Sequence, residues 1–295
     1  MKRAIKKHPV KTAFIVIIIA LLAFTLYIFK FSSFSADASL LTLSSKIAIL
    51  EIKGAILSSR EIIENIHSVK KNANVKGVVL RINSPGGGVS PSQEIYSEVK
   101  KLARSKKVVA SFSSIAASGG YYIACAAEKI VANPGSLTGS IGVVMDFSNV
   151  QGLLEKLGLR TYVIKSGKFK DIGSPLREMT HDEKQVLQSI IDTVHNQFVD
   201  AVAEGRGMNR EEIKKIADGR VFSGEQALSL GLVDKLGSLQ DSIDLVAKLA
   251  GIKGEPKVFY VDKKKGVLEY ILGGSVKDAI ENLAIPQLMY SVNNY

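Results

Sequence analysis

Short apolar runs alternate with amphipathic runs of helical spacing between residues 46 and 164. Apolar runs bounded by polar turns predict strands, whereas apolar residues three and four positions apart predict helices. The predicted strands are 46–52, 77–82, 107–111, 129–132, 141–147 and 160–164, and the predicted helices are 60–71, 93–104, 116–127 and 150–157. Strands joined by helices of this length form parallel βαβ units, so the pattern predicts an α/β fold.

After this region the apolar spacing becomes mainly helical. Thr180 and Glu183 have the spacing of a capping box, and a broad apolar helix face follows them to about residue 202. Ser223 and Gln226 repeat the capping signal ahead of a shorter helix. A long helix that extends from a compact α/β body often packs on a neighbouring subunit.

The N-terminal region contains an apolar run without charged residues over 12–29. A helix of this length spans about 27 Å, which is close to the thickness of a bilayer core. Five cations precede the run and one follows it, so the positive-inside rule predicts a cytoplasmic N-terminus and an extracytoplasmic body. The alternative is a signal peptide cleaved near 36–38, but the run is longer than a usual signal-peptide core.

These signals divide the chain into four parts. A basic tail and single-pass membrane anchor occupy 1–30, and a Ser- and Ala-rich linker follows over 31–45. We place the α/β domain at 46–252 and a C-terminal extension without an assigned role at 253–295.

The charge and cysteine content of the chain limit the partners and metal sites that we expect. The net charge of +11 looks like a signal for nucleic acid, but six cations and no acid lie in 1–30, leaving +5 for the remainder. With no nucleic-acid-binding motif in the chain, we expect no nucleic-acid partner. Cys125 is the single cysteine, which excludes an intrachain disulfide and a cysteine-rich zinc site, and no metal-binding motif is present.

Two glycine-containing segments are candidates for chemistry. Three consecutive glycines end the segment 83–88, where a turn explains one or two and close approach of a backbone N–H to an oxyanion explains the rest. In the segment 114–121, Ser118 stands where a predicted strand turns into a helix, followed by Gly119. The ordinary alternative for this serine is a helix N-cap.

A serine nucleophile needs a base, and the chain has four histidines. His8 precedes the apolar run, His67 lies in an amphipathic helix, and His181 and His195 belong to the long helix, so each fits a structural role better. The segment 165–171 instead offers three lysines, although such a run is usually a solvated loop. A lysine base must lower its pKa from about 10.4 towards roughly 7, which burial against apolar neighbours can achieve.

Together these segments resemble the signal peptide peptidase A family, which are Ser–Lys peptidases with the ClpP/crotonase fold of repeated ββα units. The resemblance covers residues from about 47 to 249 and the N-terminal anchor. It rests on five motifs in the order of the family: NSPGGG at 83–88, AASGGYYIA at 116–124, LTGSIGV at 137–143, KSGKFKD at 165–171 and GRVFSGEQAL at 219–228.

The resemblance implies a role for each of five residues. Ser118 corresponds to the nucleophile, and Lys170 to the general base that takes its proton and returns it to the leaving amine. Ser140 corresponds to a serine that orients the lysine, although the residues alone give no reason to prefer it over a neighbouring serine. The backbone N–H groups of Gly87 and Gly119 correspond to the oxyanion hole. No cofactor is implied.

The resemblance also implies partners. The family forms membrane-anchored homo-oligomeric rings, here about eight copies, in which neighbouring subunits help to shape the binding grooves. In the short form each chain supplies a complete Ser–Lys pair. The expected substrates are signal-peptide remnants and other apolar peptides.

Four alternative functions remain at this stage. The nearest is another Ser–Lys membrane peptidase of the SohB or NfeD-associated type, which differs in substrate. A crotonase-like acyl-CoA enzyme is disfavoured because coenzyme A is cytoplasmic. An α/β-hydrolase would need His181 or His195 as its base. The intact Ser118 and Lys170 argue against a catalytically inactive membrane scaffold.

Overall fold

The computed structural model describes residues 19–25, 45–261 and 289–291. The contacts within the chain divide it into two units, Met1–Ser44 and Ser45–Tyr295. The sheet and the helices that cover it belong to the second unit. Residues 19–25 are helical. No helix in the described part of the chain is long and apolar enough to cross a membrane. Most of the predicted anchor and nearly all of the predicted linker lie outside the described residues.

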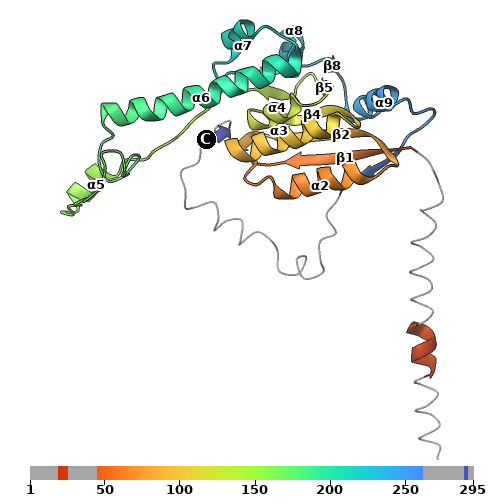
Figure 1. Ribbon diagram of the computed structural model, residues 1–295, viewed down its shortest axis with the longest axis horizontal. Coiled ribbons are helices and arrows are strands. Elements are labelled where there is room, and N and C mark those ends of the chain that lie inside the picture. The colour runs from red at the N-terminus through yellow and green to blue at the C-terminus, as the bar shows by residue number, and fades with distance from the viewer. Residues whose placement is uncertain (1–18, 26–44, 262–288, 292–295) are drawn as a thin grey trace, which may run out of the picture. The chain divides into compact units, whose positions relative to one another are not determined.

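An eight-stranded sheet forms the centre of the unit (Figure 1). Its strands are β1 (Lys46–Lys53), β2 (Val75–Ser84), β4 (Lys107–Ala117), β5 (Lys129–Ala132), β6 (Leu137–Gly139), β7 (Val221–Ser223), β8 (Lys235–Leu236) and β9 (Lys257–Tyr260). The order is β7–β6–β4–β2–β1–β9, and every pair is parallel except β6 with β7. β4 is long enough to pair with β5 along its first half and with β6 along its last three residues.

Helices cover both faces of this sheet. They are α2 (Arg60–Lys71), α3 (Val89–Ala103), α4 (Gly119–Ala124), α5 (Gln151–Lys156), α6 (His181–Arg206), α7 (Arg210–Ile216), α8 (Gly224–Ser229) and α9 (Leu239–Leu249). Side chains alternate along β1: Ile47 and Ile49 pack with α9, whereas Leu50 packs on the other face with residues of α2 and α3. The α/β class predicted from the sequence is therefore confirmed.

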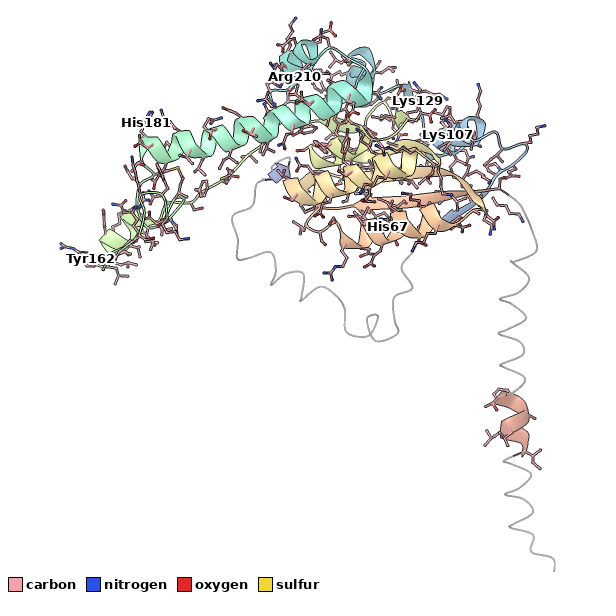
Figure 2. All side chains as sticks on the ribbon, viewed as in Figure 1. His67, Lys107, Lys129, Tyr162, His181 and Arg210 are labelled. Atoms are coloured by element: carbon pink, nitrogen blue, oxygen red, sulfur yellow. The ribbon has the colours of Figure 1, made fainter. Side chains whose placement is uncertain are left out.

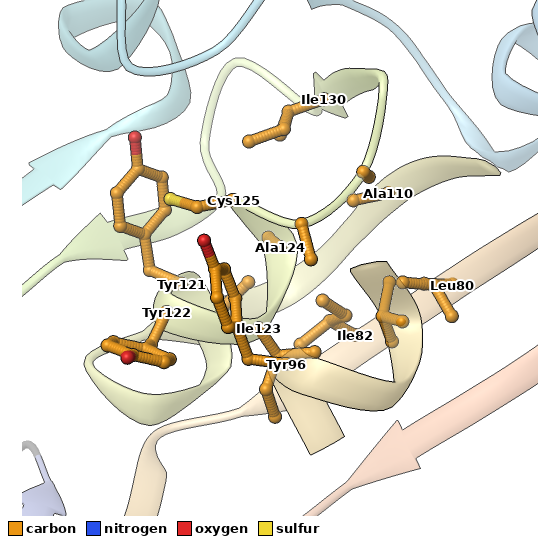
Figure 3. Close-up of a cluster of buried hydrophobic side chains, with 14 of the residues drawn as sticks. Leu80, Ile82, Tyr96, Ala110, Tyr121, Tyr122, Ile123, Ala124, Cys125 and Ile130 are labelled. Carbon is orange, nitrogen blue, oxygen red and sulfur yellow. The ribbon is translucent and has the colours of Figure 1, made fainter. Parts of the chain in front are cut away.

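The C-terminal half of α6 anchors that helix to the body. Phe198 is fully buried, and its ring lies 5.1 Å from the ring of Tyr122 in α4, which in turn lies 4.9 Å from Tyr96 in α3. Figure 3 shows Tyr96, Tyr121 and Tyr122 within this buried cluster. The predicted capping box of Thr180 and Glu183 begins α6, so this part of the prediction is confirmed.

Three predicted elements differ from the structure. Residues 160–164 form no strand, because the run has no strand beside it, and Tyr162 and Ile164 are exposed. Residues 141–147 form no strand either. The predicted helix 116–127 is shorter, because β4 continues to Ala117 to pair with β6 and leaves only α4 as helix. β9, which lies past residue 252, extends the sheet beside β1.

We expect Phe198→Ala to lower the free energy of unfolding of the full-length chain in detergent by about 3–5 kcal/mol. The substitution leaves a cavity where α6 meets α4, and urea denaturation followed by circular dichroism measures the loss. Val186→Ala is the matched control, since Val186 lies on the same helix but is exposed. An equal loss in both variants would contradict the assignment of Phe198 as the anchor.

Candidate active site

Ser118 forms the turn between the end of β4 and the start of α4. Its backbone has φ 54° and ψ −119°. Among the described residues, Ser118 and Ser140 are the two residues other than glycine with positive φ. This conformation costs energy for a residue with a Cβ and persists only where the surroundings enforce it. Here the N–H of Ser118 donates to the carbonyl of Gly139 at 2.8 Å, and its carbonyl accepts from the N–H of Tyr122 at 2.8 Å.

The Ser118 side chain is buried without a hydrogen bond. The residue is 1% exposed, and its Oγ has no partner in the described part of the chain. Buried hydroxyl groups are usually hydrogen-bonded, and leaving one unpaired costs free energy. The turn therefore holds a strained serine whose hydroxyl is not used to stabilise the fold.

Ser140 lies next to Ser118 because of strand pairing. Ala117 at the end of β4 is paired with Gly139 at the end of β6, so the two serines follow directly opposite residues. The N–H of Ser140 donates to the carbonyl of Arg220 at 2.8 Å, which fixes its turn. By contrast, the hydroxyl of the nearby Ser136 donates to the backbone carbonyl of residue 113 at 2.5 Å. The structure thus distinguishes two serines that the residues alone do not.

The strand β3 (Gly86–Gly88) approaches the start of α4. A Cβ built on Gly119 would lie 3.4 Å from the N of Gly87 and 2.5 Å from the Oγ of Ser92. The backbones of the two glycines are therefore side by side, and Gly119 directly follows Ser118 in the chain. Only glycine allows so close an approach without displacing Ser92.

The N–H of Gly87 faces the edge of β3 that lies opposite Ile56. Gly86 accepts from the N–H of Ile56, and Gly88 donates to the carbonyl of Ile56, both at 2.8 Å. Because successive residues of a strand direct their N–H and C=O groups to opposite edges, Gly87 directs its groups away from Ile56. Along that edge runs β10 (Met289–Ser291), antiparallel to β3, with Tyr290 opposite Gly87. This edge therefore accepts an extended segment of polypeptide.

Lys170 lies far from Ser118 within one chain. It belongs to residues 150–180, which we call the arm and which lie at the N-terminal end of α6 (Figure 1). Figure 2 labels Tyr162 and His181 at this end, away from the sheet. The loop of Lys170 is tied to Glu183 through Arg177, whereas α4 meets α6 at Phe198. About 22 Å of α6 lies between Glu183 and Phe198.

The expectation that a lysine of this segment lies buried against Ser118 is thus not met within a single chain. The physical reason is the absence of the predicted strand 160–164. Without sheet partners for that run, the segment that follows it is carried away from the body on the arm. Lys170 itself is exposed.

The three lysines of 165–171 differ in their contacts. Lys165 forms an ion pair with Asp171, and Lys168 forms one with Asp182 at the start of α6. Among the described residues, the amine of Lys170 has no hydrogen-bond or ion-pair partner. It is the lysine of this loop whose amine is free to engage another group.

The described histidines do not contact Ser118. His67 lies 3.0 Å from Glu98 on the surface, and His181 lies 3.0 Å from Gln185. The Nε2 of His195 is buried and, in the described part of the chain, has no hydrogen-bond partner, as is also true of the Oγ of Ser118. No hydrogen bond therefore joins this histidine to the serine. His8 lies outside the described residues.

Neither metal nor thiol chemistry is supported in the described part of the chain. No group of three His, Cys, Asp or Glu residues gathers there as a metal site would require. Cys125 is buried beside α4, and burial raises the pKa of its thiol to about 12. Such a thiol remains protonated and unreactive at neutral pH.

Two residues that shape the site, Ile56 and Ser92, could not be identified from the sequence. Ile56 holds β3 in place through backbone bonds, and Ser92 donates to the carbonyl of Gly88 at 2.8 Å while lining the approach to Gly119. Neither residue belongs to a motif, and both reach the site through contacts between separate elements. No local signal could have identified them.

Comparisons with known proteins show that the chain is similar to peptidases. The sequence model of peptidase family S49 matches residues 100–253, and that of Clp protease matches residues 38–136. A Synechocystis sp. protein named as a candidate protease is 42% identical over 82% of this chain and 89% of its own. An Enterococcus faecium protein named as a candidate signal peptide peptidase SppA is 35% identical over 80% of this chain and 72% of its own. Protease 4 of Salmonella typhi is 34% identical over 84% of this chain and 42% of its own.

We expect Gly119→Ala to slow the phosphonylation of Ser118 by a fluorophosphonate about 100-fold or more, the usual cost of disturbing one oxyanion-hole donor. The added methyl group meets Ser92 and displaces the N–H of residue 119. Time-resolved mass spectrometry of the labelled peptide gives the rate. Gly135→Ala is the matched control, because a Cβ at Gly135 meets nothing within 4 Å. Equal rates in both variants would exclude Gly119 from the site.

Proposed function

The chain belongs to peptidase family S49 and is a serine-type peptidase, and from this we propose a membrane-anchored endopeptidase that uses Ser118 and Lys170. We propose signal-peptide remnants and other apolar peptides as its substrates. The observation that carries the proposal is the strained, buried and unpaired hydroxyl of Ser118 beside the two glycine backbones.

In the proposed mechanism, Ser118 Oγ attacks the carbonyl carbon of the scissile peptide bond. The neutral amine of Lys170 accepts the hydroxyl proton and later donates it to the leaving amine. The N–H groups of Gly87 and Gly119 stabilise the negative oxygen of the tetrahedral intermediate. Ser140 orients the lysine, and water then hydrolyses the acyl-enzyme.

The edge of β3 supports binding of an extended peptide. An extended segment added to a sheet edge binds through main-chain hydrogen bonds, which suits substrates of varied sequence. The pairing of β10 with β3 is an example of such binding within this chain. In our proposal a substrate strand replaces β10 at this edge and passes its scissile carbonyl between Gly87 and Ser118.

The distance between Ser118 and Lys170 leads us to propose that the dyad forms between subunits. The arm exposes a series of large apolar side chains, which is typical of a surface that another protein covers. They are Leu153, Leu157, Leu159, Tyr162, Val163 and Ile164. We propose that the arm packs on a neighbouring copy in a ring of about eight subunits and presents Lys170 to the serine of that copy.

The uncharged run at 12–29 supports membrane anchoring. We propose a single-pass protein of the cell membrane with a cytoplasmic N-terminus, so that the peptidase domain faces the extracytoplasmic side. This location places the active site where signal-peptide remnants leave the bilayer.

Lys170→Ala is expected to abolish cleavage of a fluorogenic apolar peptide by the full-length chain in detergent. The substitution removes the proposed proton acceptor, whereas Lys168→Ala, His181→Ala and His195→Ala leave it in place and should retain activity. Steady-state rates for the four variants provide the measurement. A histidine variant without activity, together with an active Lys170→Ala, would reverse the choice of base.

The site of acylation tests the choice of nucleophile independently. A serine-directed acylating inhibitor should modify Ser118, and mass spectrometry of the digested adduct locates it. Modification of Ser140 instead would show that the two neighbouring serines have the opposite roles.

Mixing the inactive variants Ser118→Ala and Lys170→Ala should restore peptide cleavage if the dyad forms between subunits. In a mixed ring, an intact arm from the first variant can reach an intact serine of the second. The rate is measured after co-expression, with each variant alone as the control. Complete inactivity of mixed rings that are shown by mass spectrometry to contain both variants would instead place the dyad within one chain.

A further inference from the structure

Arg177 makes an unusually complete set of contacts on the arm. Its Nε donates to the Asp171 carboxylate at 2.9 Å, and its Nη2 donates to the Asp171 carbonyl at 3.3 Å. Nη1 donates to the Glu178 carbonyl and to the Glu183 carboxylate, both at 2.9 Å, and Nη2 also reaches Glu183. All five N–H donors of the guanidinium are therefore used.

Glu183 connects this arginine to the body of α6. The residue is 2% exposed, and its Oε2 accepts from the N–H and the hydroxyl of Thr180 at 2.8 and 3.1 Å. The capping box alone already satisfies the first turn of α6. The contacts from Arg177 to Asp171 are thus not needed to begin the helix, and they connect the helix to the loop instead.

Asp171 directly follows Lys170 in the chain. Arg177 holds both the carbonyl and the carboxylate of Asp171, and Lys165 pairs with the remaining oxygen of that carboxylate. The other bonds to the backbone between Gly167 and Ser174 are turn bonds, such as Lys170 N–H to the Gly167 carbonyl at 3.2 Å, and one from the Lys165 amine to the Lys168 carbonyl at 3.0 Å. Arg177 is therefore the side chain that connects both the backbone and the carboxylate of Asp171 to Glu183 of α6.

This connection remains charged over the working pH range. Hydrogen bonds from Arg177 lower the pKa of Glu183 to about 2 and also lower the pKa of Asp171. A carboxylate with a depressed pKa contributes its stabilisation above its ordinary pKa and loses it as the pH falls through the depressed value. The two acids and the two cations of the cluster, Arg177 and Lys165, balance in charge and leave Lys170 without a counter-ion.

We propose that Arg177 is a positioning residue for the general base, because it clamps Asp171 to Glu183 and so fixes the direction in which α6 presents Lys170. This inference rests on the proposed function of Lys170. An arginine suits this role better than a lysine, since its planar fork bridges two carboxylates at once with fixed geometry. A loop that carries a base must be accurate to within about 1 Å, as a displacement of that size can cost 100-fold in rate.

The experiment compares Arg177→Ala and Arg177→Lys with Lys168→Ala in the full-length chain in detergent. Lys168→Ala is the matched control, because it removes a cation of the same loop that pairs with α6 through Asp182 but does not contact Asp171. For Arg177→Ala we expect kcat to fall about 100-fold while KM changes less than 3-fold. Arg177→Lys should recover part of kcat, and added guanidinium should partly restore Arg177→Ala.

Two further measurements separate positioning from loss of folding or assembly. The thermal midpoint and the oligomer mass of Arg177→Ala should match those of Lys168→Ala. Hydrogen exchange should increase at residues 167–174 in Arg177→Ala and remain unchanged around Ser118. An unchanged kcat, or a fall in kcat explained by dissociation of the oligomer, would overturn the inference.

The same set of variants distinguishes failure of this inference from failure of the proposed function. If Lys170→Ala retains activity, the assignment of the base is wrong, whatever Arg177→Ala does. If Lys170→Ala is inactive and Arg177→Ala is as active as Lys168→Ala, Lys170 remains the proposed base and the positioning role of Arg177 is wrong. Hydrogen exchange at residues 167–174, measured with and without Arg177→Ala in a chain that also carries Lys170→Ala, tests the role of Arg177 independently of catalysis.

Discussion

The turn at Ser118 requires a residue with a side chain to adopt a backbone conformation that normally favours glycine, and the neighbouring elements meet this cost. β4 delivers the residue, the carbonyl of Gly139 in β6 accepts from its N–H, and the N–H of Tyr122 in α4 donates to its carbonyl. α4 is in turn held by Phe198 of α6. The sheet order, with β6 beside the last residues of β4, is therefore the arrangement that makes this strained serine possible.

The same arrangement explains why Ser140 and the two glycines lie at one place. Parallel strands end at the same edge of a sheet, so the residues after β4 and β6 are neighbours. β3 follows directly from the end of β2 and brings Gly87 to the same edge. The proposed nucleophile and oxyanion donors thus come from the body, whereas the proposed base comes from the arm. The position of Lys170 must then be fixed by contacts within the arm, and we assign this role to Arg177.

Much of this fold and site could be predicted from the sequence, because the relevant signals are local. The capping box at Thr180, the βαβ alternation and the motif containing Ser118 depend on short stretches of chain. The run 160–164 shows where this reasoning fails. Its pattern is that of a strand, but a strand needs a partner, and sequence periodicity does not say whether one exists. The pairing of β4 with β6, which brings Ser140 beside Ser118, likewise could not be predicted from sequence periodicity.

The separation of serine and lysine has a chemical consequence that supports assembly as part of the mechanism. A lysine accepts a proton only as its neutral amine, and Lys170 is exposed on the arm of a single chain. Burial against apolar neighbours disfavours the charged form of an amine, and an interface formed by the apolar face of the arm provides such burial. Assembly would then both deliver the lysine and deprotonate it. In our proposal a single chain holds the serine without its base, so peptide cleavage would require assembly.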